Sequence, residues 1–206
     1  MKSSSNLQRG ATLVEALVAL VVFAFGMVGI AGLMAAAVKY QVGNEARLNV
    51  TGALNDLAER IRSNTTGAKG YTAVAGGVLT TGTGYDLSET YDAQVKATPA
   101  TYSPDCSTAA CTPAQLAAYD QAKWRNLLRA TLPGGAGFIT GDITSGFTVS
   151  VMWFDKNAVD SEDAKLANTT CTDAVADQNK ASARFCCPAK AEAPDGVRCY
   201  TAKVIP

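Results

Sequence analysis

The sequence predicts an α+β protein: a long N-terminal helix, transmembrane and then amphipathic, packed on a small antiparallel β-sheet head with a short extra helix and disulfides. Three observations predict this fold class. Residues 16–38 form a run of 23 residues without a charged or polar side chain. A helix-favouring stretch without proline continues to about residue 63, and all six cysteines come after it. The 206 residues leave room for one exported domain besides the anchor helix.

The apolar run is long enough to cross a membrane. At about 1.5 Å of rise per residue, it reaches roughly 35 Å as a helix, and a hydrocarbon core is about 30 Å thick. Lys2 and Arg9 precede it, so the positive-inside tendency places the head beyond the inner membrane. A plain single-span anchor and a signal peptide cut near residues 35–37 are alternative explanations of this run.

Glu15 is a lone carboxylate at the start of this hydrophobic helix, five residues after Gly10. A charge in a membrane segment is costly and usually functional. The stretch from Arg9 to Glu15 resembles the type IV pilin superfamily, whose precursors are cut by prepilin peptidase after the glycine. The resemblance implies a leader at 1–10, cleavage between Gly10 and Ala11, and methylation of the new N-terminal amine. Many family members have phenylalanine where this chain has Ala11.

The same resemblance implies an assembly role for Glu15, not a catalytic one. A charged amine at Ala11 of one subunit would be costly in lipid, and the Glu15 carboxylate of a neighbour can pair with it. Residues 11–38 would then form the transmembrane segment before assembly and the filament core afterwards.

Residues 39–63 are expected to continue the helix as an amphipathic segment, and residues 64–206 to form a periplasmic globular head. One apolar stripe recurs at helical spacing and can pack against that head, at Val50, Leu54, Leu57 and Ile61. The polar and glycine-containing stretch 64–70 supplies the helix stop.

Within the head, residues 71–92 predict a loop or short strands, and residues 113–129 a helix. Thr112 and Gln115 have the spacing of a capping box, with Pro113 at the first helical position. The expected core face of this helix consists of Leu116, Trp124, Leu127 and Leu128. Alternation at 147–154 predicts a half-buried strand, with 138–144 as its partner across a turn at 145–146 and 197–205 as a further strand.

The cysteines are predicted to form disulfides, because they are even in number and all lie in the exported part: Cys106, Cys111, Cys171, Cys186, Cys187 and Cys199. Cys106–Cys111 is the favoured local bridge, whereas the adjacent Cys186 and Cys187 are expected to bind different partners. The connectivity stays open. No cofactor or metal site is predicted, since the chain has no histidine and no C-x-x-C pair.

The composition argues against two classes of function. Without histidine, and without a G-x-x-x-x-G-K-[ST] phosphate loop, an enzyme is the least supported class. The 18 basic and 18 acidic side chains leave no basic excess, so no nucleic-acid partner is expected.

Motifs of the head narrow the resemblance. The Cys106-x4-Cys111 loop, the capped helix with Trp124, Leu-Pro-Gly-Gly at 132–135 and a strand with Trp153 are similar to minor pilins of the type IV pilus modification (PilV) family. The similarity is strong over the first 60 residues and moderate over 106–153. It implies a tip-associated priming subunit in the initiation and assembly of type IV pili, which support twitching motility and adhesion.

The partners implied are prepilin peptidase, other minor and major pilins, the pilus assembly platform, inner-membrane lipid and a tip adhesin. The implied location is the bacterial inner membrane before assembly and the surface pilus afterwards. Two alternatives remain: a pseudopilin of a type II secretion system, and a binding module at the pilus tip.

Overall fold

The computed structural model describes residues 12–75, 78–82, 84–158, 165–172 and 184–206. The chain divides into two compact units, Met1–Glu45 and Ala46–Pro206. Helix α1 (Leu13–Ser63) begins in the first unit and ends in the second, which we call the head. The head therefore begins at residue 46, within the segment expected to be amphipathic.

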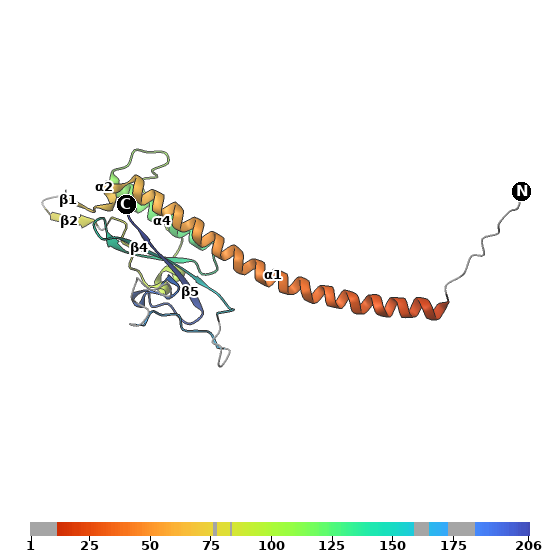
Figure 1. Ribbon diagram of the computed structural model, residues 1–206. Helices are drawn as coiled ribbons and strands as arrows, with labels where there is room; N and C mark the ends of the chain where they lie inside the picture. Colours follow the sequence, from red (N-terminus) through yellow and green to blue (C-terminus); the bar gives the residue numbers. More distant parts are fainter. Residues whose placement is uncertain (1–11, 76–77, 83, 159–164, 173–183) are drawn as a thin grey trace, which may run out of the picture. The chain divides into compact units, whose positions relative to one another are not determined.

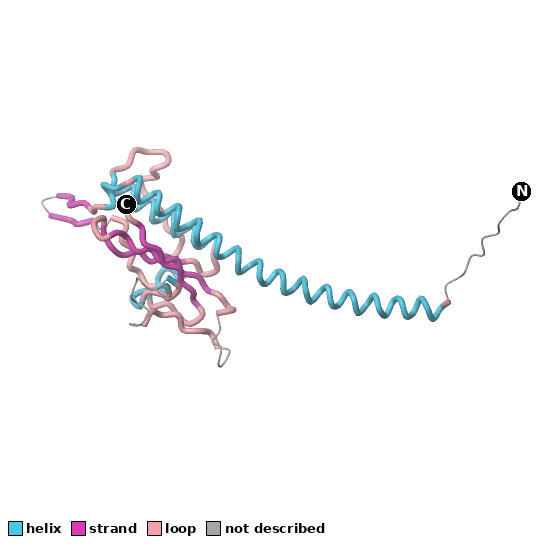
Figure 2. Tube along the Cα trace, in the orientation of Figure 1, coloured by secondary structure: helices cyan, strands magenta, loops and turns pink. Residues whose placement is uncertain are grey.

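The other elements all lie in the head (Figures 1 and 2). The helices are α2 (Thr65–Ala68), α3 (Tyr91–Lys96), α4 (Pro113–Thr131) and the 3-10 helix η2 (Ala189–Ala191). The strands are β1 (Tyr71–Ala75), β2 (Val78–Gly82), β3 (Ala136–Asp142), β4 (Gly146–Phe154) and β5 (Val197–Val204). The predicted fold class is confirmed, with the long helix, the small antiparallel sheet, extra helices and disulfides all present.

The end of α1 packs into the head through the predicted apolar stripe. Val50, Leu54, Leu57 and Ile61 are at most 5% exposed. They repeat every three or four residues, so they share one face of the helix. The helix ends at Ser63, and the side chain of Asn64 then accepts a hydrogen bond from the Gly67 N–H to start α2.

Strands β3, β4 and β5 form one antiparallel sheet in that order. The pairs run from Ala136↔Met152 to Asp142↔Gly146 and from Phe147↔Val204 to Phe154↔Val197. Residues 143–145 form the turn between β3 and β4, so the turn lies slightly earlier than predicted. Strands β1 and β2 form a separate antiparallel pair.

The sheet buries both of its faces. One apolar cluster joins Val149, Val151 and Trp153 of β4 to residues of α1 and α4. A second cluster joins Met152 to Tyr91 of α3, Ala191 of η2 and other residues of loops and strands. Because neighbouring strand residues point to opposite faces, α1 and α4 cover one face of the sheet, and the short helices α3 and η2 with the Cys187–Cys199 bridge cover the other.

Helix α4 carries the predicted capping box, but its buried face differs from the prediction. The Thr112 side chain accepts from the Gln115 N–H, and the Gln115 side chain accepts from the Thr112 N–H. Trp124 and Leu128 are fully buried as predicted, whereas Leu127 is 39% exposed and was wrongly placed in the core. Asp120, at 3% exposed, lies on the inner face of α4, where Arg60 and Tyr85 supply its buried polar partners.

Candidate membrane-anchor and assembly site

The N-terminal unit presents an apolar helical surface. Residues Leu13–Val38, 26 in number, are long and apolar enough as a helix to span a membrane, a test that a signal sequence near an N-terminus also passes. The large hydrophobic side chains of this span are 49–78% exposed in the single chain. So much exposed apolar surface marks a lipid- or protein-binding surface.

Glu15 lies in the first turn of α1 and is exposed. Its backbone N–H donates to Oγ1 of Thr12 over 3.3 Å, and the Ala16 N–H donates to the Thr12 carbonyl over 3.1 Å. The Thr12 hydroxyl therefore satisfies one of the N–H groups that are unpaired at a helix start, and its carbonyl accepts the first regular bond of the helix. Sequence reasoning missed this role, although the Thr-x-x-Glu spacing of a capping box signals it. Gly10 and Ala11, the predicted cleavage site, lie outside the described residues.

Residues 5–31 match the family described as the prokaryotic N-terminal methylation motif. The chain carries the prepilin signal of type IV pilin-like proteins. The matched range includes Gly10, Glu15 and part of the exposed apolar helix. A prepilin signal implies processing by a prepilin peptidase, membrane anchoring before assembly, and assembly with other pilins. A comparison with curated proteins and one with solved structures gave no match.

The pilin-like helix holds its head through a polar cluster inside the head unit. Arg60 of α1 contacts Asp120 of α4 over 2.8 Å and Asp56 over 2.9 Å. The hydroxyl of Tyr85 donates to the other Asp120 oxygen over 2.6 Å. The hydrogen bond from Arg60 to Asp56, followed by that to Asp120, raises the pKa of the guanidinium. Burial, reinforced by Asp120, raises the pKa of Tyr85, so the phenol stays neutral.

A polar stripe on α4 holds the preceding segment, residues 84–100, against the helix. Gln121 donates to the Asp86 carbonyl over 3.0 Å, and Arg125 forms an ion pair with Glu89 over 2.7 Å. One turn further, the Arg129 guanidinium donates to the Gln94 carbonyl. These side chains stand four residues apart on α4, which places them on one face of the helix.

Gln94 uses its side chain to close the free edge of β3. Its amide nitrogen donates to the Gly137 carbonyl over 2.7 Å, and its amide oxygen accepts from the Gly137 N–H over 3.2 Å. Two residues after Gly137 on β3, Ile139 exchanges backbone hydrogen bonds of 2.9 and 2.8 Å with Leu87. The edge strand thus keeps its backbone groups paired without a further long strand.

The six predicted cysteines form three bridges: Cys106–Cys111, Cys171–Cys186 and Cys187–Cys199. The first closes a short surface loop directly before the α4 N-cap. The last lies in the second apolar cluster, where Cys187 and Cys199 are at most 1% exposed. Among the described residues, no group of three or more acidic, cysteine or histidine side chains is placed to hold a metal ion.

Proposed function

We propose that this chain is a minor pilin that prepilin peptidase processes between Gly10 and Ala11 and that takes part in the initiation and assembly of type IV pili. One observation carries the proposal. Glu15 lies within a matched prepilin signal, in the first turn of an exposed apolar helix, five residues after Gly10. This is where an inter-subunit pairing group has to lie.

In the proposed mechanism, the apolar helix leaves the lipid of the membrane and packs into the core of the filament. Cleavage removes Lys2 and Arg9 with the leader and frees the amine of Ala11, which the same peptidase methylates. The amine of one subunit and the Glu15 carboxylate of its neighbour then form an ion pair in an apolar medium. The pair sets the axial stagger of neighbouring helices, while the apolar side chains of 13–38 replace lipid contacts with helix contacts.

The minor-pilin and tip-priming parts of the proposal rest on the head. A Cys106–Cys111 bridge stands directly before a capped α4, whose Trp124 is buried against α1. This combination resembles the PilV family of minor pilins. We place the subunit with other minor pilins at the pilus tip, beneath an adhesin, where it supports twitching motility and adhesion.

Replacing Glu15 by alanine tests the assembly role. We expect Glu15→Ala to insert into the inner membrane as the wild type does, but to be depleted about tenfold or more in sheared pili, because the neighbour's amine loses its partner. Glu45→Ala, an exposed acidic residue of the same helix, is the matched control and should incorporate normally. Normal incorporation of Glu15→Ala would contradict the assembly role.

A pseudopilin of a type II secretion system is the second candidate, because the methylation motif is common to both kinds of assembly. Deletion of the chain separates the two. Loss of surface pili with normal protein secretion supports the pilus subunit. Loss of secretion with normal pili supports the pseudopilin.

A further inference from the structure

Cys186 and Cys187 are neighbours in the sequence but belong to two different disulfides. Cys186 is joined to Cys171, and Cys187 to Cys199. Cys186 lies in a bend and Cys187 in a one-residue bridge, so their side chains point to different neighbours, and a shift of one residue would exchange the two sulfurs. The head therefore has to determine which of the two cysteines faces β5 before the bonds close.

Residues 167–171, which we call the selector segment, set the register of Cys187. The Cys187 N–H donates to the Thr169 carbonyl, and the Cys171 N–H donates to the Cys187 carbonyl, each over 2.8 Å. These bonds make a parallel bridge between Thr170 and Cys187. Because the bridge involves backbone groups of Cys187 itself, a one-residue shift would break it.

The selector segment is tied in turn to the start of β5. The Gly196 N–H donates to the Ala167 carbonyl over 2.9 Å, and the Thr169 hydroxyl donates to the Val197 carbonyl. Val197 is two residues before Cys199. The same hydroxyl oxygen lies 3.3 Å from Sγ of Cys187. Thr169 thus contacts both the strand that carries Cys199 and the sulfur that bonds to it.

We propose that Thr169 is a positioning residue that directs Cys187 to Cys199 and leaves Cys186 for Cys171. The bonds form by exchange with a disulfide-bearing oxidant in the exported compartment. The S–S bond of the oxidant breaks and its two sulfurs take the two thiol hydrogens, while the two oxidised cysteines share the new S–S bond. The oxidant supplies the chemistry, and the selector segment supplies the choice of partner.

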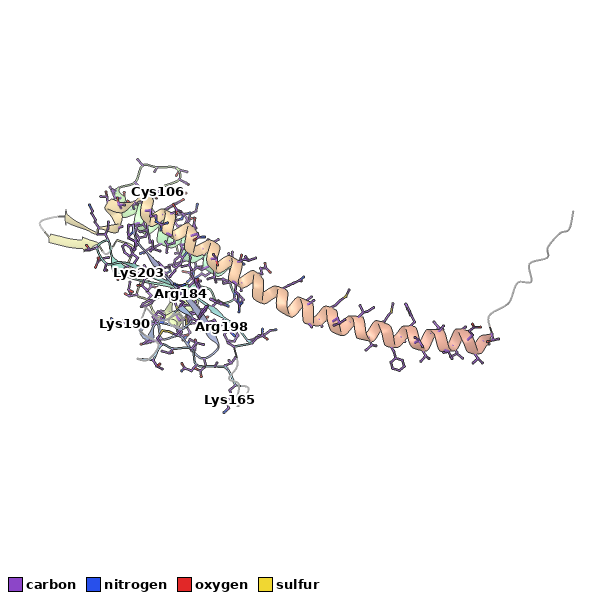
Figure 3. The ribbon with its side chains drawn as sticks, viewed as in Figure 1. Cys106, Lys165, Arg184, Lys190, Arg198 and Lys203 are labelled. Carbon is purple, nitrogen blue, oxygen red and sulfur yellow. A yellow bond between two sulfur atoms is a disulfide. The ribbon has the colours of Figure 1, made fainter. Side chains whose placement is uncertain are left out.

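A competition within the exported full-length chain tests this. In Cys186→Ser, Cys171 and Cys199 compete for Cys187, and the loser keeps a free thiol. The protein is denatured in a maleimide reagent and digested with trypsin. Cleavage at basic residues, several of which Figure 3 labels around this part of the head, places Cys171 in peptide 166–180 and Cys199 in peptide 199–203.

We expect the maleimide on peptide 166–180 to exceed that on peptide 199–203 by roughly tenfold or more. Adding Thr169→Val should lower this ratio about fivefold, because the hydroxyl loses its bond to the start of β5. Thr169→Ser keeps the hydroxyl and should restore the ratio. Thr201→Val is the matched control: it removes a hydroxyl that is 2.7 Å from that of Ser150 on the same sheet, and it should leave the ratio unchanged.

A merely structural role of Thr169 would lower the yield of protein without changing which peptide is labelled. Predominant label on peptide 199–203 in Cys186→Ser, or an unchanged ratio in the Thr169→Val variant, would overturn the proposal. If Cys186→Ser does not accumulate, fragmentation of the linked peptides 166–180, 185–190 and 199–203 reads the pairing in Thr169→Val alone. The fraction of molecules with the exchanged bridges, Cys186–Cys199 and Cys171–Cys187, must then be larger than in the wild type. An equal fraction would also overturn the proposal.

Discussion

Tyr85 donates its hydroxyl hydrogen to Asp120 over 2.6 Å inside the head. Asp120 is 3% exposed, and the second oxygen of its carboxylate accepts a hydrogen bond from Arg60 of α1. Asp120 therefore binds two parts of the head: the end of α1, through Arg60, and the segment between β2 and α3, through Tyr85. A buried carboxylate with two charge-assisted or polar partners is tolerated because its oxygens stay hydrogen-bonded.

Removing that carboxylate should destabilise the head. We expect Asp120→Ala to lower the free energy of unfolding by about 3 kcal/mol, because Arg60 and Tyr85 lose a buried partner. The measurement is urea unfolding of the detergent-solubilised chain followed by tryptophan fluorescence. Asp92→Asn, whose ion pair with Lys96 is largely exposed, should cost less than about 1 kcal/mol. Equal losses in the two variants would contradict the role of Asp120.

The same site gives a dependence of stability on alkaline pH. The pKa of Tyr85 is raised above its ordinary value of 10.0 by burial and by the bond to Asp120. Above that ordinary value the unfolded chain releases the phenolic proton while the folded chain retains it, so stability falls as the pH rises. In unfolding measured between about pH 9 and 11.5, Tyr85→Phe should show a shallower fall than the wild type. If the stability of Tyr85→Phe falls as steeply as that of the wild type, titratable groups other than Tyr85 cause the alkaline loss of stability.

Two glycine substitutions probe the packing of α4 on the sheet. A Cβ on Gly137 would meet the ring of the fully buried Trp124, whereas a Cβ on Gly52 of α1 would have no heavy atom within 4 Å. Gly137→Ala should therefore cost about 1–3 kcal/mol through overpacking. Gly52→Ala should be neutral or stabilise by up to about 1 kcal/mol, because alanine favours helix. Thermal unfolding should show a lowered midpoint for Gly137→Ala but not for Gly52→Ala, and an unchanged midpoint for Gly137→Ala would refute the contact.

Most of the elements follow from local sequence patterns. The stripe from Val50 to Ile61, the capping box at Thr112 and the alternation at 147–154 each depend on neighbours in sequence. The structure accordingly places α1, α4, β4 and β5 within a few residues of their predicted bounds. Residues 71–92 predicted a loop or short strands, and β1 and β2 form there.

The missed features depend on contacts between distant residues. Asp120 is buried because Tyr85 and Arg60, 35 and 60 residues away, satisfy its oxygens. Gln94 is buried because Gly137 offers it an unpaired strand edge. Neither partner is visible in a local pattern, so the burial of Asp120 and Gln94 was not predicted, and helical spacing alone wrongly placed Leu127 in the core. For the same reason the choice between Cys171 and Cys199 for each adjacent cysteine was left open.

The disulfides should differ in their contribution to stability. Cys187–Cys199 lies in the apolar cluster that covers one face of the sheet, whereas Cys106–Cys111 closes a short surface loop. Replacing the buried pair by alanines should cost about 3 kcal/mol or more, and replacing the surface pair by serines about 2 kcal/mol or less, since the shorter loop restricts the unfolded chain less. The rates at which an added protease degrades the two full-length variants measure this difference in stability. A reversed order would contradict this placement of the bridges.

The mass of the mature N-terminal peptide, taken from membrane and pilus fractions, tests the pilin-type assignment most directly. We predict a chain that begins at Ala11 and carries one methyl group on its amine, in both fractions. A chain that still begins at Met1 would indicate a plain membrane anchor. A start at Ala36 or Val38 would indicate a conventional signal peptide, and either result would contradict the assignment.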